Sequence, residues 1–204
     1  TVRSPLANFS ITSGGGCYDR PLTFNDLSTP AGTITEWKWN FGDGTPEQTV
    51  TAGPFTHTYL LTGGFSVSLS IKDINGCTDS YTSAGNVIIT DPVAGFRAPQ
   101  IYCPGSQLQF TDTSLGGIGF TYEWNFGDNS TPSTLQNPQH SYPAGDNNYT
   151  VKLKIRDIYG CEDSVTKTNY ISIRSPKPAF DILDTVSICA PLQTKFTFRG
   201  TDYE

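Results

Sequence analysis

The stretch Trp39-Asn40-Phe41-Gly42-Asp43 decides the fold, because the chain contains it twice. It returns as Trp124-Asn125-Phe126-Gly127-Asp128, an offset of 85 residues (124 − 39). Four further pairs keep the same order with nearly the same offset. They are Cys17 and Cys103, Leu22–Phe24 and Leu108–Phe110, His57–Tyr59 and His140–Tyr142, and Asn75–Ser80 and Tyr159–Ser164. An ordered set of this kind indicates a tandem duplication with short insertions in the loops.

The repeat predicts three segments: a first domain over residues 1–91, a second over 92–175, and the start of a third over 176–204. Pro176–Phe180 matches Pro92–Phe96, and Cys189 matches Cys103, so we expect the array to continue beyond this sequence. Prolines lie at both junctions, and proline restricts the backbone. The linkers are therefore expected to be short and semi-rigid.

Within each repeat the hydrophobic pattern has a period of two. Phe65–Ile71 and Tyr149–Ile155 alternate strictly between apolar and polar residues, as do Trp37–Phe41 and Tyr122–Phe126. Strict alternation is typical of antiparallel strands with one buried face and one face in water. Six or seven such strands, separated by Gly, Asn and Asp turns, predict an all-β two-sheet sandwich for each repeat.

Composition excludes several classes of function. The formal net charge of the 204 residues is −6, which disfavours binding to the phosphates of nucleic acids. No apolar run is long enough to cross a bilayer as a helix, so we expect no direct membrane insertion.

Each full repeat carries two cysteines, and the fifth, Cys189, matches the first cysteine of a repeat. An even pair in each repeat indicates one disulfide inside each, Cys17–Cys77 and Cys103–Cys161, formed in an oxidising compartment. The alternatives are a zinc site and a catalytic thiol. Zinc needs clustered ligands, which the sequence lacks, and no histidine stands out as partner for a catalytic thiol.

The ordered motifs resemble those of the polycystic kidney disease (PKD) domain. The first repeat carries them at Trp39–Gly44, His57–Tyr59 and Gly64–Asp73, and the second has Asn129 where Gly44 stands. The resemblance implies tandem immunoglobulin-like β-sandwiches of extracellular proteins. Such domains are mostly non-catalytic and serve as spacers, adhesion modules or attachments to secreted hydrolases. The signature residues are Trp39, Phe41, Gly42, Asp43, His57 and Tyr59, and Trp124, Phe126, Gly127, Asp128, His140 and Tyr142.

A narrower resemblance concerns the turn Asn75–Ser80. It is similar to a variant found in very long surface proteins of gliding bacteria that use type IX secretion, which are adhesins or adhesin-like. This resemblance implies a cell-surface location. The expected partners are neighbouring repeats of the same chain and a surface glycan or protein ligand.

Several side chains are candidates for binding. Some PKD-like domains bind calcium, for which the candidate carboxylates are Asp26, Asp43 and Asp73, and Asp112, Asp128 and Asp157. The alternative, which we favour, is that Asp43 hydrogen-bonds its own turn, so that no cofactor is required. Trp39 and Trp124 are expected in the core, whereas Trp37 and its counterpart Tyr122 are ligand candidates if exposed. His57 and His140 are expected to be packed strand histidines.

These observations predict a non-enzymatic segment that extends or presents the adhesive region of a large bacterial surface protein. Neither histidine lies near a Ser/Asp or Cys constellation in sequence, so a hydrolytic triad has no support. Two alternatives remain open: a module that itself binds glycan or protein, and accessory domains of a secreted hydrolase.

Overall fold

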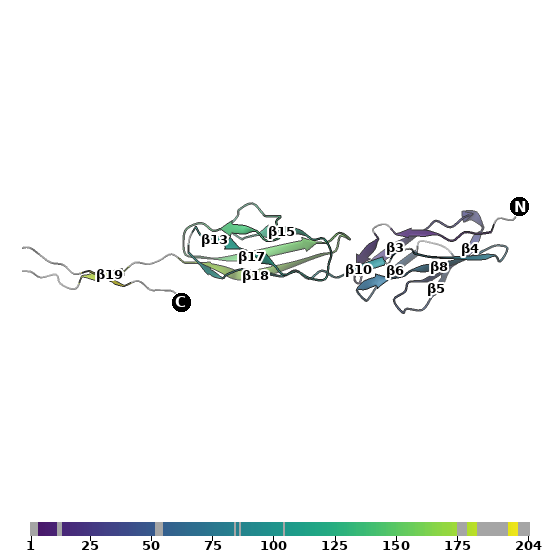
Figure 1. Cartoon of the computed structure of the whole chain (residues 1–204), viewed down its shortest axis with the longest axis horizontal. Coiled ribbons are helices and arrows are strands. Elements are labelled where there is room, and N and C mark those ends of the chain that lie inside the picture. Colours follow the sequence, from purple (N-terminus) through teal and green to yellow (C-terminus); the bar gives the residue numbers. More distant parts are fainter. Residues whose placement is uncertain are drawn as a thin grey trace, which may run out of the picture. The chain divides into compact units, whose positions relative to one another are not determined.

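The computed structural model describes residues 4–11, 14–51, 55–83, 85, 87–103 and 105–174, and the backbone of 179–182 and 196–199. The chain divides into two compact units (Figure 1). The first unit contains residues 1–95 together with 113–122 and 154–165. The second contains 96–112, 123–153 and 166–204. The expected all-β fold is confirmed, because the described residues form strands and one short 3-10 helix, η1 (Ala31–Thr33), with no α-helix.

The described residues of the first repeat form ten short strands. They are β1 (Phe9–Ile11), β2 (Gly15–Cys17), β3 (Pro21–Asp26), β4 (Ile34–Asn40), β5 (Gln48–Val50), β6 (Phe55–Thr58), β7 (Gly63–Phe65), β8 (Ser68–Asp73), β9 (Thr78–Thr82) and β10 (Val87–Thr90). One sheet has the order β5-β4-β8-β9, a second β1-β3-β6 and a third β2-β10-β7. Antiparallel pairing places Trp39 opposite Leu69 and Trp37 opposite Ile71.

The core of the first repeat lies between these sheets. The inward-facing residues predicted from the alternation are buried, among them Trp39, Leu69 and Ile71. Aromatic rings dominate this core, and Trp39 contacts Phe9, Phe24 and Phe55 through their rings. Aromatic pairs in such geometries stabilise a core beyond the area that they bury.

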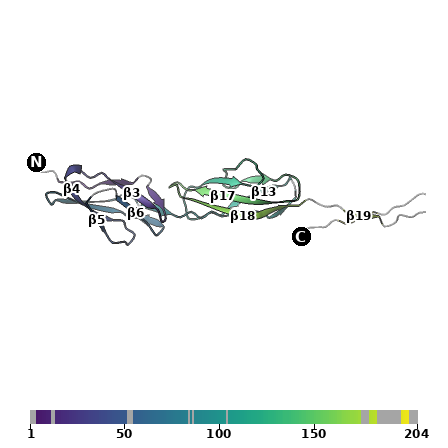
Figure 2. The same ribbon diagram turned by 180° about the vertical axis from the view of Figure 1, so that it is seen from behind.

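The second repeat has the same plan, and two of its described strands are longer than any described in the first. Its strands are β11 (Phe96–Arg97), β12 (Ile101–Tyr102), β13 (Gln107–Gln109), β14 (Thr111–Asp112), β15 (Thr121–Asn125), β16 (Gln139–Ser141), β17 (Asn147–Arg156) and β18 (Glu162–Ile173). The main sheet has the order β12-β18-β17-β15, and Figures 1 and 2 show β17 and β18 side by side. Trp124, Leu153 and Ile155 are fully buried.

The alternating run Phe65–Ile71 is interrupted, whereas its counterpart Tyr149–Ile155 lies within the single strand β17. The interruption falls between β7 and β8, where the N–H of Val67 donates to the side-chain oxygen of Ser83 instead of to a backbone carbonyl. A side chain that replaces a backbone acceptor breaks the regular ladder at that point.

Two further strands follow, β19 (Ala179–Ile182) and β20 (Phe196–Arg199), which pair antiparallel with each other. The remaining positions of 175–204 lie outside the described residues, and so does Cys189.

Candidate functional site

A buried carboxylate–imidazole pair joins the turn after β4 to strand β6. Nε2 of His57 lies 2.7 Å from Oδ2 of Asp43, and both side chains are nearly inaccessible to solvent. An ionised carboxylate only accepts hydrogen bonds, so the proton between them belongs to His57. The His57 ring stacks on Phe41 at 4.0 Å, and the Tyr59 hydroxyl donates to the carbonyl of Phe41. The pair therefore closes one end of the aromatic core.

The electrostatics of this turn favour the ionised carboxylate. Burial raises the pKa of Asp43, but hydrogen bonds from Thr45 and His57 outweigh burial and bring the pKa below its ordinary value. Burial and the nearby Asp43 carboxylate raise the pKa of Tyr59, which stays protonated. Nucleophilic catalysis would require the Thr45 hydroxyl to contact the imidazole, whereas it donates to Asp43 at 2.6 Å.

The second repeat has the same arrangement. Nε2 of His140 lies 2.8 Å from Oδ2 of Asp128, and the His140 ring stacks on Phe126 at 3.9 Å. Burial raises the pKa of Asp128, and hydrogen bonds from Ser130 and His140 again bring it below the ordinary value. The signature residues thus form the same structural motif twice.

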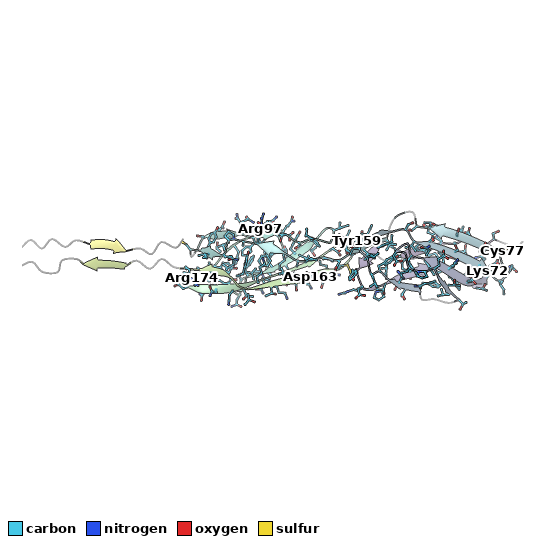
Figure 3. The ribbon with its side chains drawn as sticks, turned by 90° about the horizontal axis from the view of Figure 1, so that it is seen from below. Lys72, Cys77, Arg97, Tyr159, Asp163 and Arg174 are labelled. Carbon is cyan, nitrogen blue, oxygen red and sulfur yellow. A yellow bond between two sulfur atoms is a disulfide. The ribbon has the colours of Figure 1, made fainter. Side chains whose placement is uncertain are left out.

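The disulfide that forms is Cys17–Cys161, and it joins the first repeat to the second. The expected pairs Cys17–Cys77 and Cys103–Cys161 are therefore wrong, and Cys77 and Cys103 are free thiols. Cys77 follows the end of β8. Cys17 lies opposite Thr90 at the end of β10, and β10 runs antiparallel to β7, the strand that leads into β8. The two cysteines of the first repeat thus lie at opposite ends of its strands. Figure 3 shows Cys77 at the end of the first unit away from Tyr159, which neighbours Cys161.

Around this bond, residues of the second repeat form a turn, Asp157–Cys161, which we call the Cys161 turn. Oδ1 of Asp157 accepts the N–H groups of Tyr159 and Cys161, both at 2.9 Å. Its Oδ2 accepts a 2.5 Å hydrogen bond from the hydroxyl of Thr90, which ends the first repeat. A Cβ on Gly15 would lie 2.8 Å from the ring of Tyr159, so this contact requires glycine.

The linker between the repeats is also held by hydrogen bonds. The N–H of Asp91 donates to the carbonyl of Gly116, and Val93 and Leu115 exchange two backbone hydrogen bonds. A Cβ on Gly116, where φ is +78°, would overlap the carbonyl oxygen of Asp91. Neither the linker contacts nor the Cys161 turn was predicted from the sequence. A signal for the turn was present in the Asp-x-x-Gly-Cys pattern of Asp157–Cys161, in which the Asp caps the turn that carries the cysteine.

The candidate calcium carboxylates lie apart, each with partners of its own. Asp26 accepts the indole N–H of Trp37 at 2.9 Å, and Asp73 accepts the N–H groups of Asn75 and Cys77. In the second repeat, Asp112 accepts the side-chain amide of Gln136. Within the described part of the chain, no three His, Cys, Asp or Glu side chains gather as a metal site. The structure thus does not bring the candidate calcium ligands together, and calcium binding stays a prediction.

A family model described as the PKD domain matches residues 4–89 and again residues 89–173. The chain belongs to the PKD domain family. Each copy of the signature falls within one of these matches, so the Asp–His pairs are features of two successive PKD repeats.

The chain is similar to several solved structures of other proteins. The titin domains I67–I69, in an E-to-A mutated variant, match 98% of this chain and 77% of their own at 10% identity, with a TM-score of 0.50. The PKD1 domain of Vibrio anguillarum Epp is 24% identical over 43% of this chain and 96% of its own, with a TM-score of 0.34. Three N-terminal domains of the bacteriophage RB49 outer capsid protein Hoc are 12% identical over 97% and 70%, with a TM-score of 0.47. The titin match shows the immunoglobulin-like fold.

The aromatic ligand candidates of the PKD repeats are only partly exposed. Trp37 is half-buried, packs against Phe55 and donates its indole N–H to Asp26. Tyr122 is half-buried beside Phe120. Both expected core tryptophans, Trp39 and Trp124, are buried. A ligand role for Trp37 or Tyr122 stays a prediction. No helix in the described segments is long and apolar enough to span a membrane.

Proposed function

We propose that these PKD repeats are a non-catalytic stalk segment of a large extracellular bacterial adhesin, which extends or presents the adhesive region. The observation that carries the proposal is the Cys17–Cys161 bond, because it joins successive repeats independently of the linker. Disulfides persist in oxidising compartments, which supports an extracellular place for the chain.

The mechanical consequence of this bond is large. It closes a loop with a sequence separation of 144 residues, which corresponds to roughly 50 nm of extended chain. Tension applied to the two ends cannot extend the enclosed residues while the bond is intact. A stalk under load would therefore keep its length even if a sandwich opened.

Non-catalytic function is supported by the way the polar groups are used. In both repeats the histidine stacks on a phenylalanine and donates to an aspartate that already accepts a hydroxyl. These imidazoles, carboxylates and hydroxyls already form the hydrogen bonds that close the turn, so none of them is a free base beside a nucleophile.

Force spectroscopy on the 204-residue chain, held at its two termini, tests the mechanical part. Reduction of the protein is expected to increase the contour length released on unfolding by roughly 50 nm. Cys161→Ser should release the longer length with or without reductant. Equal lengths for oxidised and reduced wild-type protein would refute the stalk mechanism.

Antibodies against residues 1–204 test the location. They should label intact cells of the source organism as strongly as permeabilised cells, and mild surface proteolysis should remove the signal. Labelling that requires permeabilisation would contradict an extracellular adhesin.

A further inference from the structure

The free Cys103 lies in the second repeat where the bonded Cys17 lies in the first. β12 pairs parallel with the end of β18 in the second repeat, as β2 pairs parallel with β10 in the first. In the turn after Cys17, the N–H of Arg20 donates to the carbonyl of Cys17 at 3.3 Å. The N–H of Ser106 donates to the carbonyl of Cys103 at the same distance. The backbone that presents Cys17 to the following repeat is therefore present around Cys103 as well.

Each of these first cysteines lies beside the linker that leads into the next repeat. The register of β2 and β10 places Cys17 opposite Thr90, just before the first junction. The register of β12 and β18 places Cys103 opposite Arg174, just before the second. Cys103 is exposed and lines an open pocket of about 340 Å³ together with Ile101, Tyr102, Ser106 and Arg174.

The turn that carries the second cysteine forms in both repeats, whether or not its cysteine is bonded. The Cys161 turn is bonded, and its counterpart in the first repeat, Asp73–Cys77, is free. In both turns the leading aspartate accepts two backbone N–H groups at 2.8–2.9 Å. The glycine before the cysteine has φ of +85° at Gly160 and +84° at Gly76. The turn therefore belongs to the repeat itself and does not depend on the disulfide.

The backbone after the second junction pairs as the start of a PKD repeat does. In each case the strand that opens the repeat pairs antiparallel with a strand a short distance along the chain. The opening phenylalanines are Phe9, Phe96 and Phe180, and their partners are Asp26, Asp112 and Phe198. The separations are 17, 16 and 18 residues (26 − 9, 112 − 96 and 198 − 180). This register supports, independently of any cysteine, a third repeat that starts where the repeated sequence places it, at residue 176.

We propose that the first cysteine of each repeat bonds the second cysteine of the following repeat, so that Cys103 forms a disulfide with the Asp-x-x-Gly-Cys turn of the third repeat. The partner lies about 84 residues after Cys161, the offset between Cys77 and Cys161 (161 − 77). It follows Cys189 in chain order, because Cys17 also passes over two cysteines before it bonds. The inference rests on the Cys17–Cys161 pairing and not on the stalk role.

The other cysteines of this sequence do not suit Cys103. Cys189 matches Cys17 and Cys103 in the repeat, and those two do not bond each other. Cys161, in the same repeat as Cys103, is already bonded. Cys77 lies in the preceding repeat, whereas the bond from Cys17 runs forward to the following one. The turn of the next repeat is the partner that the bonded pair specifies.

The bond forms by thiol–disulfide exchange with a small disulfide such as oxidised glutathione. The Cys103 thiolate attacks the small disulfide and releases one small thiolate, which leaves a mixed disulfide on Cys103. The thiolate from the third repeat's turn then attacks the Cys103 sulfur and releases the second small thiolate. Two protein thiols lose two protons and two electrons, and one small disulfide is reduced to two thiols.

Bonds of this kind overlap along the chain. The Cys17–Cys161 bond encloses the first junction, and the bond from Cys103 encloses the second. Because Cys103 precedes Cys161, the two loops share the residues between them, so both linkers lie inside a loop. A single cut in either linker then leaves its two sides covalently joined, whereas one disulfide inside each repeat would leave the linkers unprotected.

Peptide mapping of the full-length natural protein tests the pairing. The protein is alkylated with N-ethylmaleimide to block exchange and is digested without reduction. Cys103 should be recovered linked to the second cysteine of the third repeat, with loss of its free thiol. Recovery of Cys103 as a free thiol, or linked to any other cysteine such as Cys189, would overturn the proposal.

Two variants of the full-length protein provide a matched comparison. Cys103→Ser should leave the second cysteine of the third repeat free, so that a thiol reagent labels it before reduction. Cys77→Ser should leave that cysteine blocked. Labelling in both variants, or in neither, would also overturn the proposal. If Cys103 were free while Cys17 remained linked to Cys161, this inference would fail and the stalk proposal would not be affected.

Discussion

The hydroxyl of Thr90, at the end of the first PKD repeat, donates a 2.5 Å hydrogen bond to the carboxylate of Asp157 in the second. The same hydroxyl lies 3.3 Å from Sγ of Cys161, and both Thr90 and Asp157 are buried. One carboxylate therefore closes the Cys161 turn through Oδ1 and binds the preceding repeat through Oδ2. The disulfide therefore lies beside a polar contact that orients its turn.

Thr90→Val should destabilise this part of the chain by about 1–3 kcal/mol, because it leaves a buried carboxylate oxygen without its donor while almost conserving volume. The measurement is urea unfolding, together with amide hydrogen exchange at Cys161, which should become faster. Thr35→Val removes an exposed hydroxyl that donates to the carbonyl of Lys72, and should cost under about 0.5 kcal/mol. Equal costs for the two variants would contradict the role of Thr90.

Non-reducing peptide mapping of oxidised protein should recover Cys17 linked to Cys161. Cys17→Ser should lower the free energy of unfolding by about 2–5 kcal/mol, since a long loop is no longer closed in the unfolded chain. Cys103→Ser changes an exposed free thiol and is the matched control, with an expected change under about 0.5 kcal/mol. Recovery of Cys17 linked to Cys77 would refute the pairing seen here.

The sequence predicts the sandwiches well because local pattern and burial agree. Alternation marks Leu69 and Ile71 as inward-facing, and the repeated Trp39 and Trp124 are buried as expected. The disulfide pairing could not be predicted in this way. Counting two cysteines in each repeat does not reveal that β8 and β10 run in opposite directions, which separates Cys77 from Cys17.

The Asp–His pairing shows a similar limit. The motifs identify Asp43 and His57, but they do not reveal that the two side chains lie within hydrogen-bonding distance. That distance depends on how the turn after β4 packs against β6. The favoured expectation that Asp43 hydrogen-bonds its own turn holds through Thr45, and the structure adds His57 as a second partner.

Gly42→Ala should destabilise the first repeat far more than Gly44→Ala. Both glycines have positive φ, +77° and +86°, so either substitution carries a backbone cost of about 1–2 kcal/mol. Only at Gly42 would the new Cβ overlap the carbonyl oxygen of Ser66, whereas Gly44 faces open space. Thermal unfolding measures the difference, and similar melting temperatures for the two variants would contradict the predicted overlap.

The second repeat supplies a natural control for this comparison. Asn129 occupies the position of Gly44 with φ of +64°, so Gly44→Asn should be nearly neutral. Gly127 retains glycine at the position of Gly42, and a Cβ added there would overlap the carbonyl oxygen of Thr150. Gly42→Asn should therefore be as damaging as Gly42→Ala.

Asp43→Asn should lower stability at neutral pH by about 1–3 kcal/mol, because the charged acceptor for His57 and Thr45 is lost. The pKa of Asp43 is lower in the folded protein than its ordinary value of about 3.9 in an unfolded chain. The stabilisation is therefore complete above the unfolded value and is lost as the pH falls through the folded pKa.

Urea unfolding of wild type and Asp43→Asn from neutral pH to pH 2 measures this window. The difference between them should shrink as the pH falls below about 4. Asp128→Asn is expected to behave in the same way through His140, since its pKa is lowered for the same reasons. Glu123→Gln, an exposed carboxylate on β15, should change stability by under about 0.5 kcal/mol at neutral pH. If the Asp43→Asn difference instead grew as the pH fell below about 4, the carboxylate would be stabilised in its protonated form, which would contradict its lowered pKa.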